Sequence, residues 1–408
     1  MAKLSAALPA VGAAPASSGG SPDGPQPYLS RDPMVSLVQS AINGALTDNS
    51  SRGGAATGTG LWQRLAFTVK GLFHPGNFSP TDPDWVVKIA ESMLGHLAKG
   101  NHPFNPRPAE HAISDTARLV VVGDWGTGLP RARAVASHMA EEVSTALEDG
   151  REAHVIHLGD VYYSGLPSEY QRHALAYWPV TSGQARAGVT SWSLNGNHDM
   201  YSGGFGYFET LLGDPRFAGQ YSPDGRATSF FRLTSPSWEF VGLDTAWDAN
   251  VLSEGAVGVL RDPQADYVNS VAAASGRKLA LLSHHQYVSV YDRADIGEEL
   301  GAKLGPVLRD GRVTAWFWGH EHRCMGFNST GGVAFPRCLG HGGVPVLQEH
   351  EADAAIPSPG AWEYRDYLVS GNQRWARFGF AVLDLAGDRI TVRYMSEEGA
   401  LVRTEEIA

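Results

Sequence analysis

The stretch "RVTAWFWGHEH", residues 312–322, decides how the fold is interpreted. Between Arg312 and Gly319 every side chain except Thr314 is apolar, and the run is rich in aromatic and β-branched residues. Such a short run predicts a buried strand. His320 and His322 follow it directly. Two solvated imidazoles at a strand end would explain the pattern, and so would a pair of metal ligands.

Four other apolar runs end in residues that can bind metal. The ends carry Asp124 in "VVVGDWG", Asp160 in "HLGDVYY", Asn197 and His198 in "NGNHD", and His284 and His285 in "LLSHHQ". Helix-like segments such as "PRARAVASHMAEEVSTALED" alternate with these runs, which predicts an α/β fold with a mainly parallel sheet.

The carboxyl ends of the strands in such a sheet form the crevice where ligands bind, so the five ends are expected to converge. A Gly-Asp pair or a histidine at one strand end is usually an ordinary turn or core residue. Five such ends in one chain favour a metal site. Carboxylate, amide and imidazole donors together suit Fe, Zn or Mn rather than a thiolate-type zinc.

The bulk composition is that of a globular protein and excludes several function classes. The chain has 408 residues, 43% hydrophobic and 18% charged, with a formal net charge of −11. This acidic balance argues against nucleic-acid binding. No apolar run is long enough to span a bilayer, and two cysteines cannot form a disulfide framework. Without a convincing leader sequence, we expect a cytoplasmic protein.

Three regions are expected along the chain. Residues 1–30, rich in Ala, Gly, Ser and Pro, predict a disordered tail. Residues 31–115 are expected to form a small helical region, with helices over 31–48 and 83–99. Residues 116–408 are expected to form a single larger domain, which a hairpin at Gly387 and Asp388 is expected to close.

The ordered motifs resemble those of the calcineurin-like metallophosphoesterases, and within them the purple acid phosphatase branch. The motifs are "GDWG" (123–126), "GDVYY" (159–163), "GNHD" (196–199), "SHHQ" (283–286) and "GHEH" (319–322). The resemblance covers about residues 117–395. It implies a two-sheet β-sandwich flanked by helices, an αββα architecture.

One motif places the chain in its branch. Most members of the family carry Asp-x-His in the first motif, but Gly126 stands at the third position here. Purple acid phosphatases share "GDWG" and use a tyrosine three residues after the second motif's aspartate, which is Tyr163. The adjacent Tyr162 is the alternative. A trivalent iron would favour the ionised form of such a tyrosine.

The resemblance implies two metal ions that share Asp160. One would be held by Asp124, Asp160, Tyr163 and His322, and the other by Asp160, Asn197, His284 and His320. Iron is expected at the first position, and Zn, Mn or Fe at the second. His285 is the rival of His284. His320 and His322, as alternate residues of an extended chain, would lie on one side of it and aim at one ion each.

Such a centre implies hydrolysis of small phosphorylated substrates by a metal-bound hydroxide. The resemblance gives His198 the role of general acid or phosphate contact, beside Asn197. Asp199 would orient His198, or else be a helix cap. His341 is a further candidate for the substrate pocket. The alternatives are a phosphodiesterase or nucleotide hydrolase and, ranked lower, a non-catalytic metal-binding scaffold.

Overall fold

The computed structural model describes residues 99–249, 257–293 and 295–408. It also describes seven positions near the amino terminus: Leu29, Arg31, Pro33, Ser36, Leu37, Gln39 and Ser40. The predicted tail and most of the predicted helical region, including nearly all of 31–48 and 83–99, therefore lie outside the described residues. The positions from Pro33 to Ser40 that the structure describes are helical.

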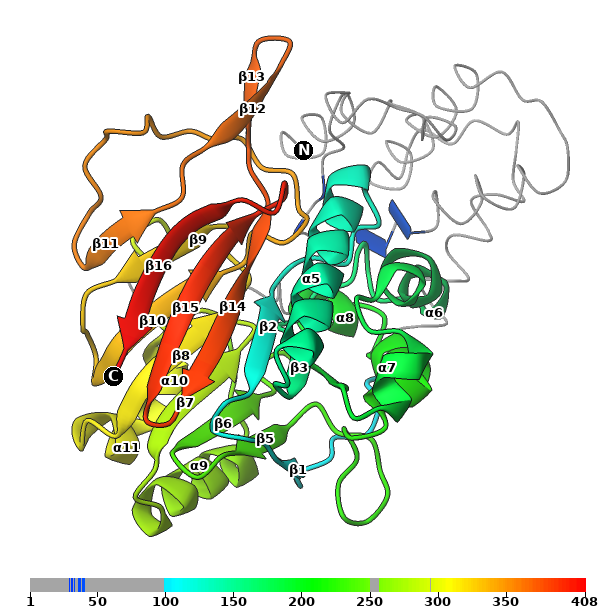
Figure 1. Cartoon of the computed structure of the whole chain (residues 1–408), viewed down its shortest axis with the longest axis vertical. Coiled ribbons are helices and arrows are strands. Elements are labelled where there is room, and N and C mark those ends of the chain that lie inside the picture. Colours follow the sequence, from blue (N-terminus) through cyan, green and yellow to red (C-terminus); the bar gives the residue numbers. More distant parts are fainter. Residues whose placement is uncertain are drawn as a thin grey trace, which may run out of the picture.

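Two β-sheets form the centre of the fold (Figure 1). The six-stranded sheet has the order β16 (Leu401–Ile407), β15 (Arg389–Ser396), β14 (Gly379–Ala386), β2 (Arg118–Val122), β3 (Ala153–His157), β4 (Thr190–Ser193). The eight-stranded sheet has the order β1 (Ala109–Ala112), β5 (Phe231–Thr234), β6 (Trp238–Leu243), β7 (Lys278–Ser283), β8 (Val313–Trp318), β10 (Val333–Leu339), β9 (Cys324–Phe327), β11 (Gly360–Glu363). A separate hairpin pairs β12 (Tyr367–Ser370) with β13 (Gln373–Ala376).

The main core lies between the two sheets. Alternate residues of facing strands fill it, among them Val121 of β2, Leu282 of β7 and Phe317 of β8, all fully buried. The other faces of both sheets are also covered by apolar residues, because helices pack on each. The layers therefore follow the order helix, sheet, sheet, helix, which confirms the expected αββα sandwich.

Helix α5 (Pro130–Glu148) covers the six-stranded sheet (Figure 1). It begins with a proline, whose fixed φ suits the first helical position. Val135, Met139 and Val143 recur every four residues and are buried against the sheet. On the eight-stranded sheet the corresponding layer consists of α9 (Asp262–Ala274), α10 (Glu298–Lys303) and α11 (Gly305–Arg309).

The shorter helices cluster beyond β3 and β4. They are α6 (Pro167–Glu169), α7 (Ser182–Arg186), α8 (Asn197–Met200), the π-helical turns Tyr170–Ala174 and Gly206–Leu211, and the 3₁₀ turns Leu175–Tyr177 and Pro215–Phe217. Among the described residues, no helix combines the length and the apolar character that crossing a membrane requires.

The sheets are mixed rather than mainly parallel. Strands β2, β3 and β4 are parallel to one another, and so are β6, β7 and β8. Strands β14, β15 and β16 instead add to β2 in antiparallel fashion. The hairpin predicted at Gly387 and Asp388 joins β14 to β15, with Gly387 at φ 65°. The parallel blocks are the ones that carry the predicted donor residues at their ends.

The two sheets meet at the carboxyl edge of these parallel strands. Backbone hydrogen bonds join them there, from Gly123 N–H to Leu339 C=O at 3.1 Å and from Gly342 N–H to Gly123 C=O at 3.0 Å. Within the eight-stranded sheet, Gly319 N–H donates to His284 C=O at 3.0 Å. The loops after β2, β7, β8 and β10 are thereby held in one place.

Candidate metal centre

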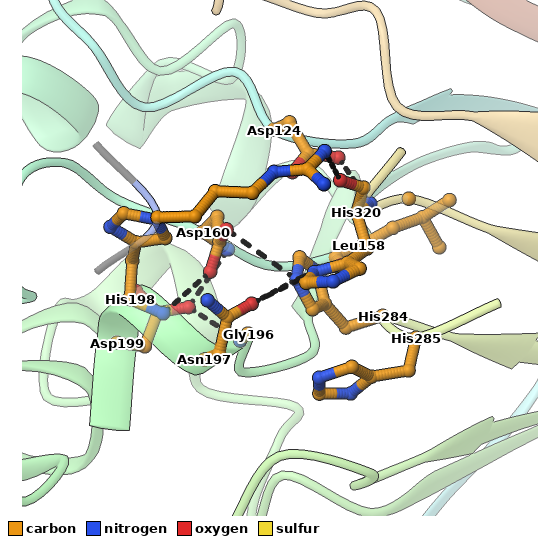
Figure 2. A network of polar contacts seen from close by, with 12 residues as sticks. Asp124, Leu158, Asp160, Gly196, Asn197, His198, Asp199, His284, His285 and His320 are labelled. Carbon is orange, nitrogen blue, oxygen red and sulfur yellow. Dashed lines mark hydrogen bonds and ion pairs between the residues drawn. The ribbon is translucent and has the colours of Figure 1, made fainter. Parts of the chain in front are cut away.

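The donor residues predicted from the five strand ends lie together at this edge. Two groups of buried side chains bring their ligand atoms within 4.8 Å of one another: Asp160, His284 and His320 in one, Asp124, Asp160 and His322 in the other. Asp160 belongs to both groups. In Figure 2 the side chains of Asp160, Asn197 and His284 point toward one another.

The first group also contains Asn197. Its Oδ1 lies 3.0 Å from Nε2 of His284 and 2.9 Å from Nδ1 of His320. Asp160 Oδ2 lies 3.4 Å from the same Nε2. Two donors bound about 2.1 Å from one ion would be about 3.0–3.4 Å apart at octahedral or tetrahedral angles. The spacing of these atoms therefore fits a shared cation.

His284, and not His285, faces this group. Nδ1 of His284 donates to the backbone carbonyl of Leu158 at 2.9 Å, which leaves Nε2 as the atom aimed at Asp160 and Asn197. The ring of His285 packs against that of His320, centroid to centroid 4.7 Å, and its Nδ1 is 3.0 Å from Oγ1 of Thr245.

In the second group the tyrosine is Tyr162, where Tyr163 was expected. The Tyr162 hydroxyl lies 3.2 Å from Oδ1 of Asp124, 3.0 Å from Oδ2 of Asp160 and 3.1 Å from Nε2 of His322. The last atom is itself 3.4 Å from Oδ1 of Asp124. Assigning Tyr163 to this position is therefore corrected.

The local backbone explains the difference. Val161 forms a parallel bridge with Gly126, and Tyr162 N–H donates to Gly126 C=O at 2.9 Å, so the backbone on either side of Tyr162 is held against Gly126. Tyr163 packs against the cluster of Leu29, Tyr162 and Val344, and burial raises the pKa of its phenol to about 12.

Gly126 is required by the same close approach. A Cβ at this position would lie 2.6 Å from Cγ2 and 2.8 Å from Cα of Val161. A histidine therefore has no room at the third position of the first motif. The segment that excludes it is the one that brings Tyr162 to the cluster.

Four of the candidate ligands have a left-handed backbone. Asp124, Asp160, His320 and His322 have φ of 55°, 76°, 68° and 55°, and no other non-glycine among the described residues has a positive φ. L residues adopt this region at a cost, and such residues concentrate at functional sites.

This corrects the expected geometry of the "GHEH" motif. Strand β8 ends at Trp318, and Glu321 N–H donates to Gly319 C=O at 2.8 Å, so residues 319–322 form a tight turn and not an extended chain. His320 and His322 still reach different groups of donors, but the turn is what separates them.

Burial controls the electrostatics of the cluster. Burial raises the pKa of Asp160 to about 7, mainly because the carboxyl is removed from water. The negative charge of Asp124 is a smaller effect in the same direction. Burial likewise raises the pKa of Asp124 and lowers the pKa of His320 and of His322. Neutral imidazoles beside buried carboxylates form a donor set that a cation would stabilise.

His198 presents one ring nitrogen to the site. Its Nδ1 lies 2.6 Å from the carbonyl oxygen of Tyr163, and its backbone N–H donates to Oδ1 of Asp160 at 2.9 Å. Nε2 is buried and has no hydrogen-bond partner in the described part of the chain. Burial lowers the pKa of the ring to about 4.

Asp199 does not orient His198, and that expectation is corrected. Its carboxylate accepts hydrogen bonds from the backbone N–H groups of Gly196, Asp160 and Val161 at 2.7, 2.8 and 3.0 Å, and from the Tyr170 hydroxyl. It stands at the third position of α8, where it caps the helix start, as the alternative interpretation held. Asp199 thus holds the turns around Asp160, while the Tyr163 carbonyl orients His198.

His341 lies in the loop after β10, and its ring contacts structural neighbours. It is near Gly379 and 6.3 Å, centroid to centroid, from Tyr364. Burial lowers the pKa of the ring to about 3. No recorded contact joins this ring to the described donor groups.

One residue at the centre was missed from the sequence. Arg31 donates a hydrogen bond from its guanidinium to the backbone carbonyl of His320. Its own carbonyl accepts from the Tyr201 hydroxyl at 2.7 Å, and that hydroxyl accepts from Nδ2 of Asn197 at 2.6 Å. The two partners Arg31 and His320 are 289 positions apart, so no local pattern indicates the contact.

Comparisons with known proteins agree with the site. Tartrate-resistant acid phosphatase type 5 from the rabbit Oryctolagus cuniculus is 26% identical over 317 residues, which cover 72% of this chain and 91% of that protein. The enzyme of the same name from Mus musculus is 25% identical over 271 residues, covering 62% and 78%.

Among solved structures, GAP50, described as the anchor in the inner membrane complex of Plasmodium, aligns with a TM-score of 0.49 and 14% identity. The alignment covers 71% of this chain and 88% of GAP50. The profile of the calcineurin-like phosphoesterase family matches residues 117–324, about half of the chain. The resemblance carried by the five motifs is thereby confirmed, and the chain belongs to the calcineurin-like phosphoesterase family.

Proposed function

We propose that this protein hydrolyses phosphoric esters at a centre that holds two metal ions. The observation that carries the proposal is the pair of donor groups that share Asp160. Each group combines carboxylate and imidazole, all buried, and the groups lie at the edge where both sheets present their strand ends. Similarity to acid phosphatases supports the same reaction class.

The ligand sets follow from the contacts described above. One ion would be held by Asp124, Asp160, Tyr162 and His322, and the other by Asp160, Asn197, His284 and His320. We propose iron for the first position, because a phenolate oxygen favours a trivalent ion, and Zn, Mn or Fe for the second. When bound, two such ions supply an activated water and positive charge for displacement at phosphorus.

The protein's own contribution is to hold these donors and to manage a proton. Asp199 fixes the backbone of Asp160, and the Leu158 carbonyl fixes the ring of His284. His198 uses Nδ1 on the Tyr163 carbonyl, so Nε2 is the atom left to exchange a proton with the leaving group of an ester.

The test is turnover and metal content of the purified protein with p-nitrophenyl phosphate. His198→Ala is expected to lower turnover by roughly 10²–10⁴ while both metal equivalents are retained. His138→Ala, in an ion pair with Glu141 on α5, is the matched control and should leave both unchanged. A wild-type protein that binds two metals and hydrolyses neither p-nitrophenyl phosphate nor its bis-ester would overturn the proposal.

A further inference from the structure

Arg31 brings a positive charge to the metal centre from far away in the sequence. Its guanidinium donates to the carbonyl of His320, a candidate ligand. The Arg31 side chain therefore reaches the centre itself and not merely its rim.

Described residues before and after Arg31 contact the domain that carries the metal centre. Leu29 is buried with Tyr162 and Val344. Ser40 Oγ lies 2.6 Å from Oγ of Ser164 and donates to Oε1 of Glu169 at 2.6 Å. Attachments on both sides of Arg31 make its position a property of the fold.

The polar path through Tyr201 links the same residue to a second ligand. Asn197 Nδ2 donates to the Tyr201 hydroxyl, which donates to the Arg31 carbonyl. Asn197 precedes His198, which is proposed to exchange a proton at Nε2. Arg31 is thus tied twice to the first donor group, through His320 on one side and Asn197 on the other.

Arginine suits a phosphate group better than any other side chain. Its planar guanidinium carries five N–H donors and matches phosphate oxygens two at a time. Arg31 is exposed as a residue, whereas the candidate ligands are buried, so this arginine is accessible to solvent. A side chain that served only as a buried counter-charge would not need this exposure.

We propose that Arg31 binds the phosphoryl group of the substrate at the metal centre. This inference rests on the proposed function. It assigns Arg31 a direct contact with phosphate oxygens and predicts weaker binding of phosphorylated ligands when the guanidinium is removed.

The experiment compares Arg31→Ala, Arg31→Lys and a control, Arg389→Ala. Arg389 is also exposed, but it begins β15 opposite Ala386, at the end of the six-stranded sheet far from Asp124, because β14 runs antiparallel to β2. The readouts are KM and kcat for p-nitrophenyl phosphate, metal content, and calorimetric titration of the metal-loaded protein with inorganic phosphate.

Arg31→Ala should weaken inorganic phosphate binding and raise KM by about ten- to a hundredfold, since a hydrogen bond between charged groups is lost. Arg31→Lys should recover part of this loss, because it keeps the charge but not the fork. Metal content should stay at the wild-type level, and Arg389→Ala should resemble wild type throughout.

Two results would overturn the inference. Unchanged phosphate affinity in Arg31→Ala would remove Arg31 from the substrate site, whether or not metal is lost. Faster turnover with unchanged or tighter phosphate binding would show that the arginine obstructs the site. The titration needs no turnover, so a protein that fails to hydrolyse esters defeats the proposed function while the role of Arg31 is still decided.

Discussion

Gly196→Ala is expected to disrupt the metal centre and leave the fold intact. Gly196 precedes Asn197 and caps the start of α8. A Cβ here would lie 2.7 Å from Cγ of Asp160 and 2.7 Å from Cε1 of His284, and closer still to Oδ1 of Asp160. Its φ of −106° is open to alanine, so the effect comes from crowding and not from the backbone.

The magnitude follows from these distances. Relief of the clash needs a movement of roughly 1 Å by the carboxylate shared between the two donor groups, and a misplacement of this size can cost about 10²-fold in rate. Neither neighbour moves freely: Asp160 Oδ1 accepts from His198 N–H, and Nδ1 of His284 is bound to the Leu158 carbonyl. We therefore expect turnover to fall by about 10²-fold or more, with loss of at least one metal equivalent.

The assay combines metal analysis, turnover of p-nitrophenyl phosphate and thermal unfolding. Gly276→Ala is the matched control, because a Cβ at that exposed position meets nothing within 4 Å. The control should keep both metals and full activity. If Gly196→Ala bound two metals and turned over at the wild-type rate, the tight approach of Asp160 to Gly196 would not describe the working enzyme.

Two further predictions concern the tyrosines and His341. Tyr162→Phe is expected to abolish the visible absorption of the iron-loaded protein and to weaken iron binding by about tenfold or more. Tyr163→Phe should keep both the absorption and the iron affinity. The reverse pattern in absorption spectra would make Tyr163 the ligand. His341 is neutral in the folded protein, because burial lowers its pKa to about 3. Below about pH 6.5 its ring is therefore protonated in the unfolded chain but not in the folded protein. The unfolding free energy therefore falls by up to about 1.4 kcal/mol per pH unit as the pH drops toward 3. Urea titrations of His341→Gln should show a correspondingly weaker loss of stability in acid. A raised KM in this variant with an unchanged pH dependence of stability would instead favour the pocket role first expected of His341.

The strand ends could be predicted from the sequence because each is a local pattern. A buried apolar run followed by glycine and a donor needs no knowledge of the rest of the chain, and the parallel blocks bring such ends together. The structure places Asp124, Asp160, Asn197, His284 and His320 at one edge accordingly. The expectation of a mainly parallel sheet failed where strands carry no donors, since β14 to β16 form antiparallel hairpins.

Details within two residues of a ligand were harder to predict. Whether Tyr162 or Tyr163 turns inward depends on the backbone after Asp160, which is set by the bridge between Val161 and Gly126. The role of Asp199 depends on where α8 begins, because a carboxylate at the third helical position turns back to the backbone. Sequence spacing alone does not determine either.

Arg31 could not be predicted at all. Its contact with His320 exists only in the folded chain, where Leu29 also lies beside Val344. Arg31 directly follows residues 1–30, which are rich in Ala, Gly, Ser and Pro, and it stands in no metal-binding motif. Contacts of this kind depend on tertiary packing, which the local pattern does not contain.

The backbone is left-handed at four candidate ligands, Asp124, Asp160, His320 and His322. At these positions the conformation lowers the stability of the fold, while the side chain is needed for activity. Each such conformation costs on the order of 1–2 kcal/mol for an ordinary L residue, so glycine at any of them would relax the chain while deleting a donor. Selection for thermal stability alone would therefore favour replacing these candidate ligands. A more thermostable variant of this protein should be checked for these four side chains before its activity is assumed.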